Sequence, residues 1–297
     1  LKIIKMKNSL WTVFLFALLF TPASIASDDF SIKEISEDLI VFNQGGEQSI
    51  LIVNEESSIL VDPLNEHTAK QIQGFLTSNS KPMISHIIYS HSHWDRISTG
   101  TAFLNKDVEV IAQQACGLYL SNNQAVLKPT KYFQNYLEIT VGGKTINLYY
   151  YGPSHGECMI VIHLIKENLL FIPDLLHTKG ARFPMDPTLP YLRPATLINF
   201  FIELETLVEK KEIKSFITGH TGIKLTGSTS IIAEQRIFWE LMQATAEQAE
   251  EDGIINLDNF IDLEKLDLEP YQQYENYSSE DLINIIRRYT SFQNMGR

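Results

Sequence analysis

The order of apolar and polar positions predicts two strand-rich stretches, each followed by helices. Residues 35–64 alternate apolar and polar side chains and predict a meander that ends at Val61-Asp62-Pro63. Residues 67–78 predict a helix, and the apolar run at 84–89 predicts a buried strand. Further strands are expected at 108–112, 138–141, 145–151, 159–165, 168–172 and 215–218, and further helices at 98–105, 113–121, 195–210 and 229–250. This order predicts an α/β fold, a four-layer αβ/βα sandwich.

The pattern of apolar and charged residues changes after Glu251. Residues 251–275 are acidic and broken, and residues 279–290 predict a short amphipathic helix. Too many apolar side chains lie in this stretch for a fully solvated tail, namely Phe260, Leu263, Leu266, Leu268 and Tyr271. We therefore expect one main domain at 27–250 and a C-terminal helical extension at 251–297 that packs on it.

The first 26 residues have the pattern of a secretory signal peptide. Lys2, Lys5 and Lys7 precede the apolar run 10–20, and Ser24-Ile25-Ala26 supplies small residues for cleavage after Ala26. The alternative, a membrane anchor, needs a longer apolar run to cross about 30 Å of hydrocarbon. The pattern predicts a secreted, periplasmic protein with no stable membrane anchor after cleavage.

Charge and cysteine content narrow the classes of partner. The formal net charge is −12, and loss of the three lysines in the first 26 residues takes it to −15. A nucleic-acid partner is therefore not expected.

Cys116 and Cys158 are the two cysteines. They can pair in an oxidising compartment, but the sequence alone favours two buried, unpaired thiols.

The richest cluster of chemically active side chains is His91-Ser92-His93-Trp94-Asp95-Arg96, directly after the expected strand at 84–89. Side chains that leave the end of a strand on a tight loop can converge on one point. Imidazoles and carboxylates are common metal ligands. The motif therefore predicts a metal site.

Three further ligand types follow apolar runs elsewhere. His155 follows the strand expected at 145–151, Asp174 follows the run 169–173, and His220 follows the strand expected at 215–218 and one glycine. Each alone is a common turn residue. Together with the double-histidine motif they predict one shared site.

At this point the chain resembles the metallo-β-lactamase superfamily over roughly residues 35–245. Its five ordered motifs match Val61-Asp62-Pro63, the segment 91–95, His155, Asp174 and His220. The resemblance implies the metallo-β-lactamase fold and a zinc-dependent hydrolase. It implies that one zinc binds His91, His93 and His155, that a second binds Asp95, Asp174 and His220, and that Asp62 orients a ligand.

Arg96 departs from the family pattern. Most members have a histidine directly after the motif aspartate, and that histidine binds the second metal. A guanidinium stays protonated and cannot coordinate. Some β-lactamases of the family have arginine there, but they combine it with cysteine at the fourth motif, where this chain has Asp174. One or two zinc ions per chain are both compatible with this sequence.

The expected chemistry is hydrolysis. Zinc held by three imidazoles lowers the pKa of a bound water to about 7. Asp95 is expected to orient the nucleophile and to pass a proton to the leaving group, and Arg96 is placed beside it as a catalytic residue.

The expected substrate is a small molecule. His177, Lys179 and Arg182 are candidates to bind an anionic group on it, with ordinary solvated charges as the alternative. Trp94 is a candidate pocket wall, but the residues alone favour a plain core aromatic. Ester, lactone, thioester and sulfate-ester hydrolysis form the leading interpretation. A β-lactamase and a non-catalytic metal-binding or accessory protein are the alternatives, and no feature of the sequence indicates an oligomeric state.

Overall fold

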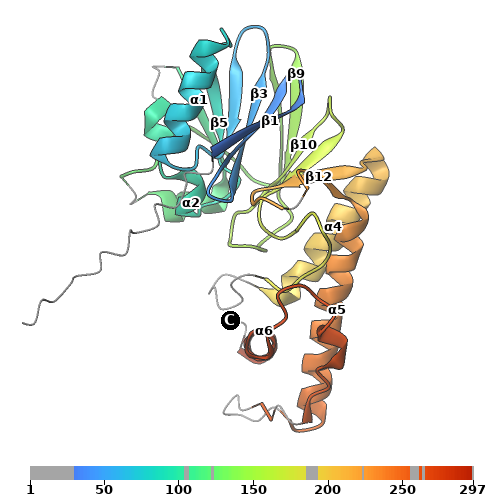
Figure 1. The fold of residues 1–297 in the computed structure, drawn as a ribbon. Coiled ribbons are helices and arrows are strands. Elements are labelled where there is room, and N and C mark those ends of the chain that lie inside the picture. The colour runs from blue at the N-terminus through green and yellow to red at the C-terminus, as the bar shows by residue number, and fades with distance from the viewer. Residues whose placement is uncertain are drawn as a thin grey trace, which may run out of the picture.

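Two mixed β-sheets, each covered by helices on its outer face, form the body of the molecule (Figure 1). The computed structural model describes residues 30–103, 107–121, 124–184, 193–222, 224–254, 261–262 and 265–295. The first sheet has the order β1-β2-β3-β4-β5-β6-β7 and the second the order β13-β12-β11-β10-β9-β8. The four-layer sandwich expected from the sequence is confirmed.

The strands of the first sheet are β1 (Phe30–Ser36), β2 (Leu39–Gln44), β3 (Glu47–Val53), β4 (Ser58–Val61), β5 (Ile84–Ile88), β6 (Glu109–Gln113) and β7 (Lys131–Phe133). Those of the second are β8 (Tyr136–Val141), β9 (Lys144–Tyr149), β10 (Val161–Leu164), β11 (Leu169–Ile172), β12 (Ser215–Thr218) and β13 (Gly227–Ser228). β1 to β4 are antiparallel, whereas β4 to β7 pair in parallel, as do β11 and β12.

The helices are α1 (Glu66–Ser78), α2 (Trp94–Ile97), α3 (Gly117–Leu120), α4 (Pro194–Lys211), α5 (Ser230–Glu251) and α6 (Ser279–Met295), with 3-10 turns at η1 (Gly100–Phe103), η2 (Gln114–Cys116) and η4 (Glu269–Tyr271). Local chemistry sets where they begin. The side chain of Asn65 accepts a hydrogen bond from the backbone N–H of Thr68 and caps α1. Pro194 begins α4, where a missing N–H leaves no hydrogen bond unmade.

Alternation along the strands sorts apolar side chains into separate layers. In β2, Leu39 and Val41 face the second sheet, whereas Ile40 and Phe42 face α1. A third cluster fills the space between the second sheet and helices α4, α5 and α6. Because both faces of each sheet are covered, the central strands read as continuous apolar runs, as β11 does.

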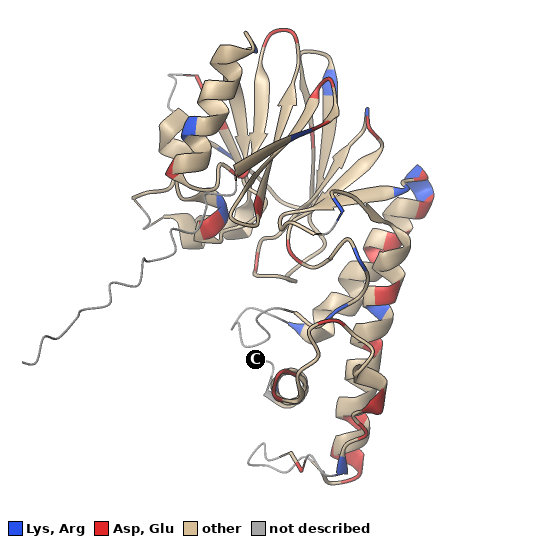
Figure 2. Cartoon of the chain, viewed as in Figure 1, with Lys and Arg blue, Asp and Glu red and all other residues tan. Residues whose placement is uncertain are grey.

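The C-terminal extension shares the third cluster with α4 and α5. Tyr271, Leu282, Ile285 and Tyr289 are buried there, and α6 lies beside α5 (Figure 1). Acidic side chains are spread along α5 (Figure 2). The described part of the extension thus packs on α4 and α5, and Phe260 and Leu263 lie outside the described residues.

Two helix predictions need correction. The helix expected at 98–105 begins earlier, as α2, and is followed by the 3-10 turn η1. His93 is extended and its carbonyl accepts the N–H of Arg96, so the first turn forms inside the motif. The helix expected at 113–121 is split into η2 and α3.

Two short strands, β7 and β13, have too few residues to show a period of two in the sequence. The expected signal peptide lies outside the described residues. Within the part of the chain that the structure describes, no helix has the length and apolarity to cross a bilayer.

Candidate metal centre

The predicted ligands come together at one edge of the sandwich. His91 lies three residues past β5, and His155 lies in the loop that joins β9 to β10. Asp174 and His220 each lie two residues past the parallel strands β11 and β12. Because both strands of a parallel pair end at the same edge, residues far apart in the sequence meet there.

Three histidines form a cluster with the geometry of a metal site. His91, His93 and His155 each offer one ring nitrogen, and these three atoms lie within 4.8 Å of one another. Nδ1 of His93 and Nε2 of His155 are 3.2 Å apart. Two nitrogens on one tetrahedral zinc stand about 3.3 Å apart, given Zn–N bonds of about 2.0–2.1 Å. The three residues therefore fit one zinc ion.

A buried relay fixes the ring of His91. The hydroxyl of Ser90 donates to Oδ2 of Asp62 at 2.6 Å, and Ser90 Oγ lies 2.9 Å from Nδ1 of His91. Since the Ser90 proton is used on Asp62, Nδ1 of His91 carries its own proton and donates to Ser90. The lone pair of His91 Nε2 then points toward the cluster. In this way Asp62, acting through Ser90, orients a ligand, which is the role that the resemblance implies for it.

Burial keeps the cluster neutral. Burial lowers the pKa of His91 well below its usual range and lowers the pKa of His93 to about 4, with neighbouring His155 adding to the second shift. The pKa of His155 is also lowered, again mainly by burial. Only a neutral imidazole can donate a lone pair to a metal, so this environment suits the ligand role.

Asp174 lies between this cluster and Arg96. Its Oδ2 is 3.0 Å from Nε2 of His91, and its Oδ1 is 2.8 Å from Nη2 of Arg96. Burial raises the pKa of this carboxyl, but the charge of Arg96 and the contacts with His91, His220 and His155 together outweigh it and hold the pKa of Asp174 well below its usual range. Asp174 is therefore a buried carboxylate.

Glu47 completes the surroundings of Arg96, and the sequence reasoning missed it. One of its oxygens is 2.8 Å from Nη2 of Arg96 and the other is 3.2 Å from Nδ1 of His220. Glu47 opens β3 directly after the Gly45-Gly46 turn, and a lone acidic residue at a hairpin carries no signal of a distant partner. The turn brings it to His220 through the bridge between these two residues.

Both ring nitrogens of His220 are engaged. Nε2 is 2.6 Å from Oδ1 of Asp174, and Nδ1 contacts Glu47. Burial lowers the pKa of His220, but its hydrogen bonds to Asp174 and Glu47 outweigh this and raise the pKa to about 9. Both ring nitrogens therefore face carboxylate oxygens in this structure.

The second metal site implied by the resemblance therefore does not fit the observed contacts. Asp174 and His220 are held by Arg96 and Glu47, and Asp95 lies 3.9 Å from Nε of Arg96. In the described part of the chain, the three histidines are the one group of three or more such side chains with metal-site spacing.

A cavity of about 420 Å³ opens beside the cluster. Trp94 and Tyr119 line it, together with Ser92, His93, Asp95, Gly156 and Glu157. Trp94 is 75% exposed, so the expectation of a core aromatic is wrong and the pocket-wall interpretation holds. Burial raises the pKa of Asp95, whose carboxylate faces this cavity.

A disulfide joins the two walls of this cavity. Cys116 and Cys158 are bonded, which corrects the expectation of unpaired thiols. Cys116 ends η2, three residues before Tyr119, and Cys158 directly follows Glu157. The sequence could not show that these two loops, from opposite sheets, meet.

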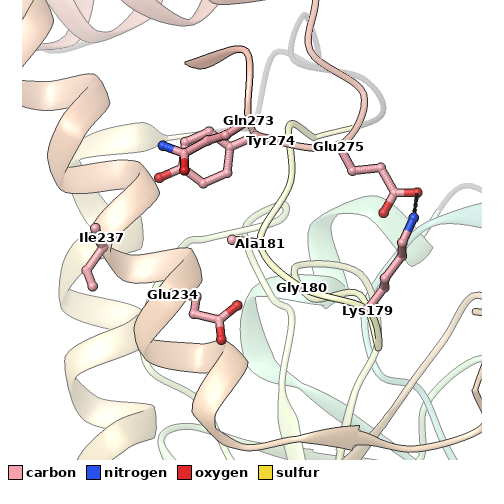
Figure 3. Close-up of a pocket in the computed structure, with 8 residues that line it drawn as sticks. All are labelled: Lys179, Gly180, Ala181, Glu234, Ile237, Gln273, Tyr274 and Glu275. Atoms are coloured by element: carbon pink, nitrogen blue, oxygen red, sulfur yellow. Dashed lines mark hydrogen bonds and ion pairs between the residues drawn. The ribbon is translucent and has the colours of Figure 1, made fainter. Parts of the chain in front are cut away.

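The basic residues expected to bind a substrate anion contact Glu275 of the extension. Nδ1 of His177 is 3.6 Å and Nζ of Lys179 is 3.3 Å from its carboxylate. The backbone of Arg182 is held by both polar atoms of the Gln235 side chain. Lys179 and Glu275 line a separate cavity of about 570 Å³, which also includes Glu234 and Tyr274 (Figure 3).

The chain was compared with known proteins. Residues 43–220 match the family model described as the metallo-beta-lactamase superfamily. The metallo-beta-lactamase type 2 of Bacteroides fragilis is 27% identical, over 54% of this chain and 71% of that protein.

Solved structures of the same fold are similar at lower identity. A metallo-beta-lactamase from Pontibacter korlensis matches with a TM-score of 0.61 at 15% identity, over 71% of this chain and 99% of its own. An inverting sec-alkylsulfatase from Pseudomonas sp. matches with a TM-score of 0.68 at 14% identity, over 90% of this chain and 50% of its own. At these identities the structures support the fold alone.

The family match covers more than half of the chain and includes every residue of the histidine cluster. This chain belongs to the metallo-β-lactamase superfamily, as a hydrolase with a three-histidine metal site.

Proposed function

We propose that this protein is a zinc-dependent hydrolase that opens the cyclic amide of β-lactams outside the cytoplasm. The observation that carries the proposal is the position of the three-histidine cluster, which lies beside a cavity that an exposed tryptophan and a tyrosine line. A ring-bearing small molecule can lie against these aromatic faces with its carbonyl near the cluster.

His91, His93 and His155 would hold the ion, with His91 oriented by Ser90 and Asp62. When bound, zinc supplies Lewis acidity and lowers the pKa of a coordinated water to about 7. Asp95 faces the cavity and has a raised pKa, so its carboxylate is suited to accept a proton and return it to the leaving nitrogen. Asp174 places a negative charge 3.0 Å from His91, which strengthens cation binding at the cluster.

The choice of a β-lactam rests on the similarity to the metallo-beta-lactamase type 2 of Bacteroides fragilis. The cavity adds a physical reason, because an aromatic wall suits a fused bicyclic ring. Carboxylic and sulfate esters are the second candidate class. Their support is the structural similarity to an alkylsulfatase, which covers 90% of this chain and so extends into the C-terminal helices.

Export is supported by the disulfide. Cys116 and Cys158 account for both cysteines of the chain, and such bonds persist mainly in oxidising compartments. Together with the basic and apolar pattern of residues 1–26, this favours a secreted, periplasmic location.

The test is hydrolysis of a chromogenic cephalosporin, followed in parallel with a nitrophenyl ester and a nitrophenyl sulfate. The proposal expects turnover of the cephalosporin that is lost on chelation and returns with zinc. His93→Ala should lose both zinc and activity, whereas His67→Ala, on the exposed face of α1, should keep both. Turnover of an ester or sulfate alone would refute the β-lactam assignment and leave the metal-dependent hydrolase intact.

A further inference from the structure

Arg96 is a fully buried arginine surrounded by carboxylates. Its side chain has 0% exposure, and Asp174 and Glu47 each lie 2.8 Å from its Nη2. Asp95 lies 3.9 Å from its Nε. A guanidinium keeps its positive charge at every physiological pH, so three carboxylates surround one permanent cation.

The backbone is shaped to admit this side chain. Nη1 of Arg96 donates to the carbonyl of Gly219 at 2.5 Å. A Cβ at Gly219 would lie 2.7 Å from Cζ of Arg96 and 2.7 Å from the carbonyl oxygen of Pro173. Only glycine fits there, directly before His220, so the guanidinium lies against the turn that carries this residue.

Two of these carboxylates, Asp174 and Asp95, are those that the family resemblance assigns to a second metal. Asp174 and Asp95 face Arg96, and Asp174 also contacts Nε2 of His220. A cation in this position has the electrostatic role of a metal ion, since it neutralises the carboxylates and fixes their orientation. A metal and a guanidinium cannot both occupy the space next to Oδ1 of Asp174.

We propose that the guanidinium of Arg96 takes the place of the second metal ion, so that this protein binds one zinc per chain. Arg96 acts as a positioning residue. It holds Asp174 by Oδ1, which leaves Oδ2 directed at the three-histidine cluster. Glu47 holds Arg96 on its other side and joins it to His220.

This inference rests on the three-histidine site of the proposed function, and metal stoichiometry tests it without reference to substrate. Purified full chain is stripped with chelator and titrated with Zn²⁺ by calorimetry, with metal content after dialysis as a second readout. The wild type should bind one equivalent. Arg96→His removes the fixed charge and supplies a ligand. Its affinity for a second Zn²⁺ should therefore be at least about tenfold higher than that of the wild type.

Two further variants separate replacement of charge from simple damage. Glu47→Gln disturbs the same network but keeps the guanidinium, so it should still bind one equivalent. Arg96→Gln is neutral, polar and smaller than arginine, and should gain affinity for a second equivalent even if Arg96→His does not fold. The absorption spectrum of Co²⁺ in place of Zn²⁺ shows whether the second ion enters a protein site.

The outcomes separate this inference from the proposed function. Two equivalents of equal affinity in the wild type would overturn the role of Arg96 and leave the hydrolase intact. One equivalent in wild type and in both folded Arg96 variants would also overturn it. One equivalent in the wild type, two in Arg96→His and no turnover of any substrate would support the inference and refute the proposed function. No bound zinc in the wild type would overturn both.

Discussion

The guanidinium of Arg96 and the carboxylate of Asp174 form a buried ion pair at 2.8 Å, with side-chain exposures of 0% and 4%. These residues are far apart in the sequence and come from different sheets, one in α2 after β5 and one after β11. Such a pair stabilises little as a whole, but each partner depends on the other.

The Arg96–Asp174 pair predicts strong energetic coupling. In the chelated protein, Asp174→Asn or Arg96→Met alone should each lower the free energy of unfolding by about 3–5 kcal/mol, because each removes one member of a buried ion pair and leaves the charge of the other incompletely balanced. The double variant should lose less than the sum, with coupling of about 1–3 kcal/mol. Urea denaturation measures all four proteins. Losses that add within about 0.5 kcal/mol would show that the two residues act independently.

The disulfide predicts a joint effect on stability and on the cavity. Closing a loop of 42 residues stabilises by about 4 kcal/mol on the chain-entropy account. Reduction should therefore lower the free energy of unfolding by about this amount. Reduction should also raise KM, because Tyr119 and Glu157 line the cavity and lie close in sequence to Cys116 and Cys158. The Cys116→Ala/Cys158→Ala variant should behave like the reduced protein and should not respond to reductant; a response there would assign the effect to something else.

Most of the architecture and the histidine cluster could be predicted from the sequence, because they rest on local patterns. The apolar runs place β5, β11 and β12, and the site residues at 91, 93, 155, 174 and 220 follow strand ends. The turn glycines and prolines mark where those strands end.

What could not be predicted depends on contacts between distant segments. Glu47 reaches Arg96 and His220 across a hairpin turn, and Cys116 meets Cys158 between two loops. Glu275 reaches back from the extension to Lys179. No periodicity or motif marks a side chain whose partner is set by tertiary packing alone.

The exposed aromatic wall predicts an effect on substrate affinity. Trp94→Ala and Tyr119→Ala should each raise KM for an aromatic cephalosporin about three- to tenfold, since one aromatic contact contributes about 0.5–1.5 kcal/mol. The value of kcat should stay near that of the wild type, because neither side chain takes part in the hydrogen bonds of Asp62 and Ser90 that orient His91. Ile202→Ala, an exposed apolar residue on α4 that lines neither of the two cavities, is the matched control. A fall in kcat with no change in KM would contradict a role in binding.

Glu275 provides a test of the predicted anion-binding cluster. Glu275→Gln removes the carboxylate that contacts His177 and Lys179. If these basic residues contact substrate, KM for an anionic substrate should fall about two- to fivefold, while KM for an uncharged analogue stays unchanged. Stability should change by less than about 1 kcal/mol, since Lys179 is 56% exposed.

Glu234 supplies the matched control for this variant. It lines the same cavity as Lys179 and Glu275 but has no ion pair with Lys179 (Figure 3). Glu234→Gln removes one negative charge from the same region. An equal fall in KM in both variants would show a general charge effect and would remove His177, Lys179 and Arg182 from the substrate site.

Asp62 predicts a pH dependence of stability. Burial raises its pKa to about 7, against the nearby charge of Arg96 and the hydrogen bonds from Ser90, which lower it. The unfolded chain has the ordinary value of 3.8, so the folded state holds this proton more tightly. The resulting stabilisation is fully present below pH 3.8 and is lost progressively as the pH rises to about 7, a total on the order of 4 kcal/mol.

Asp62→Asn has no proton to lose, so its free energy of unfolding should lack this component. In chelated protein, the difference in stability between wild type and Asp62→Asn should shift in favour of the variant between pH 4 and pH 8. Denaturation at several pH values measures this difference. Asp62→Asn should also weaken zinc binding about 10- to 100-fold, because the relay through Ser90 that orients His91 is lost. A pH-independent difference, with zinc affinity unchanged, would mean that Asp62 neither titrates in this range nor orients His91.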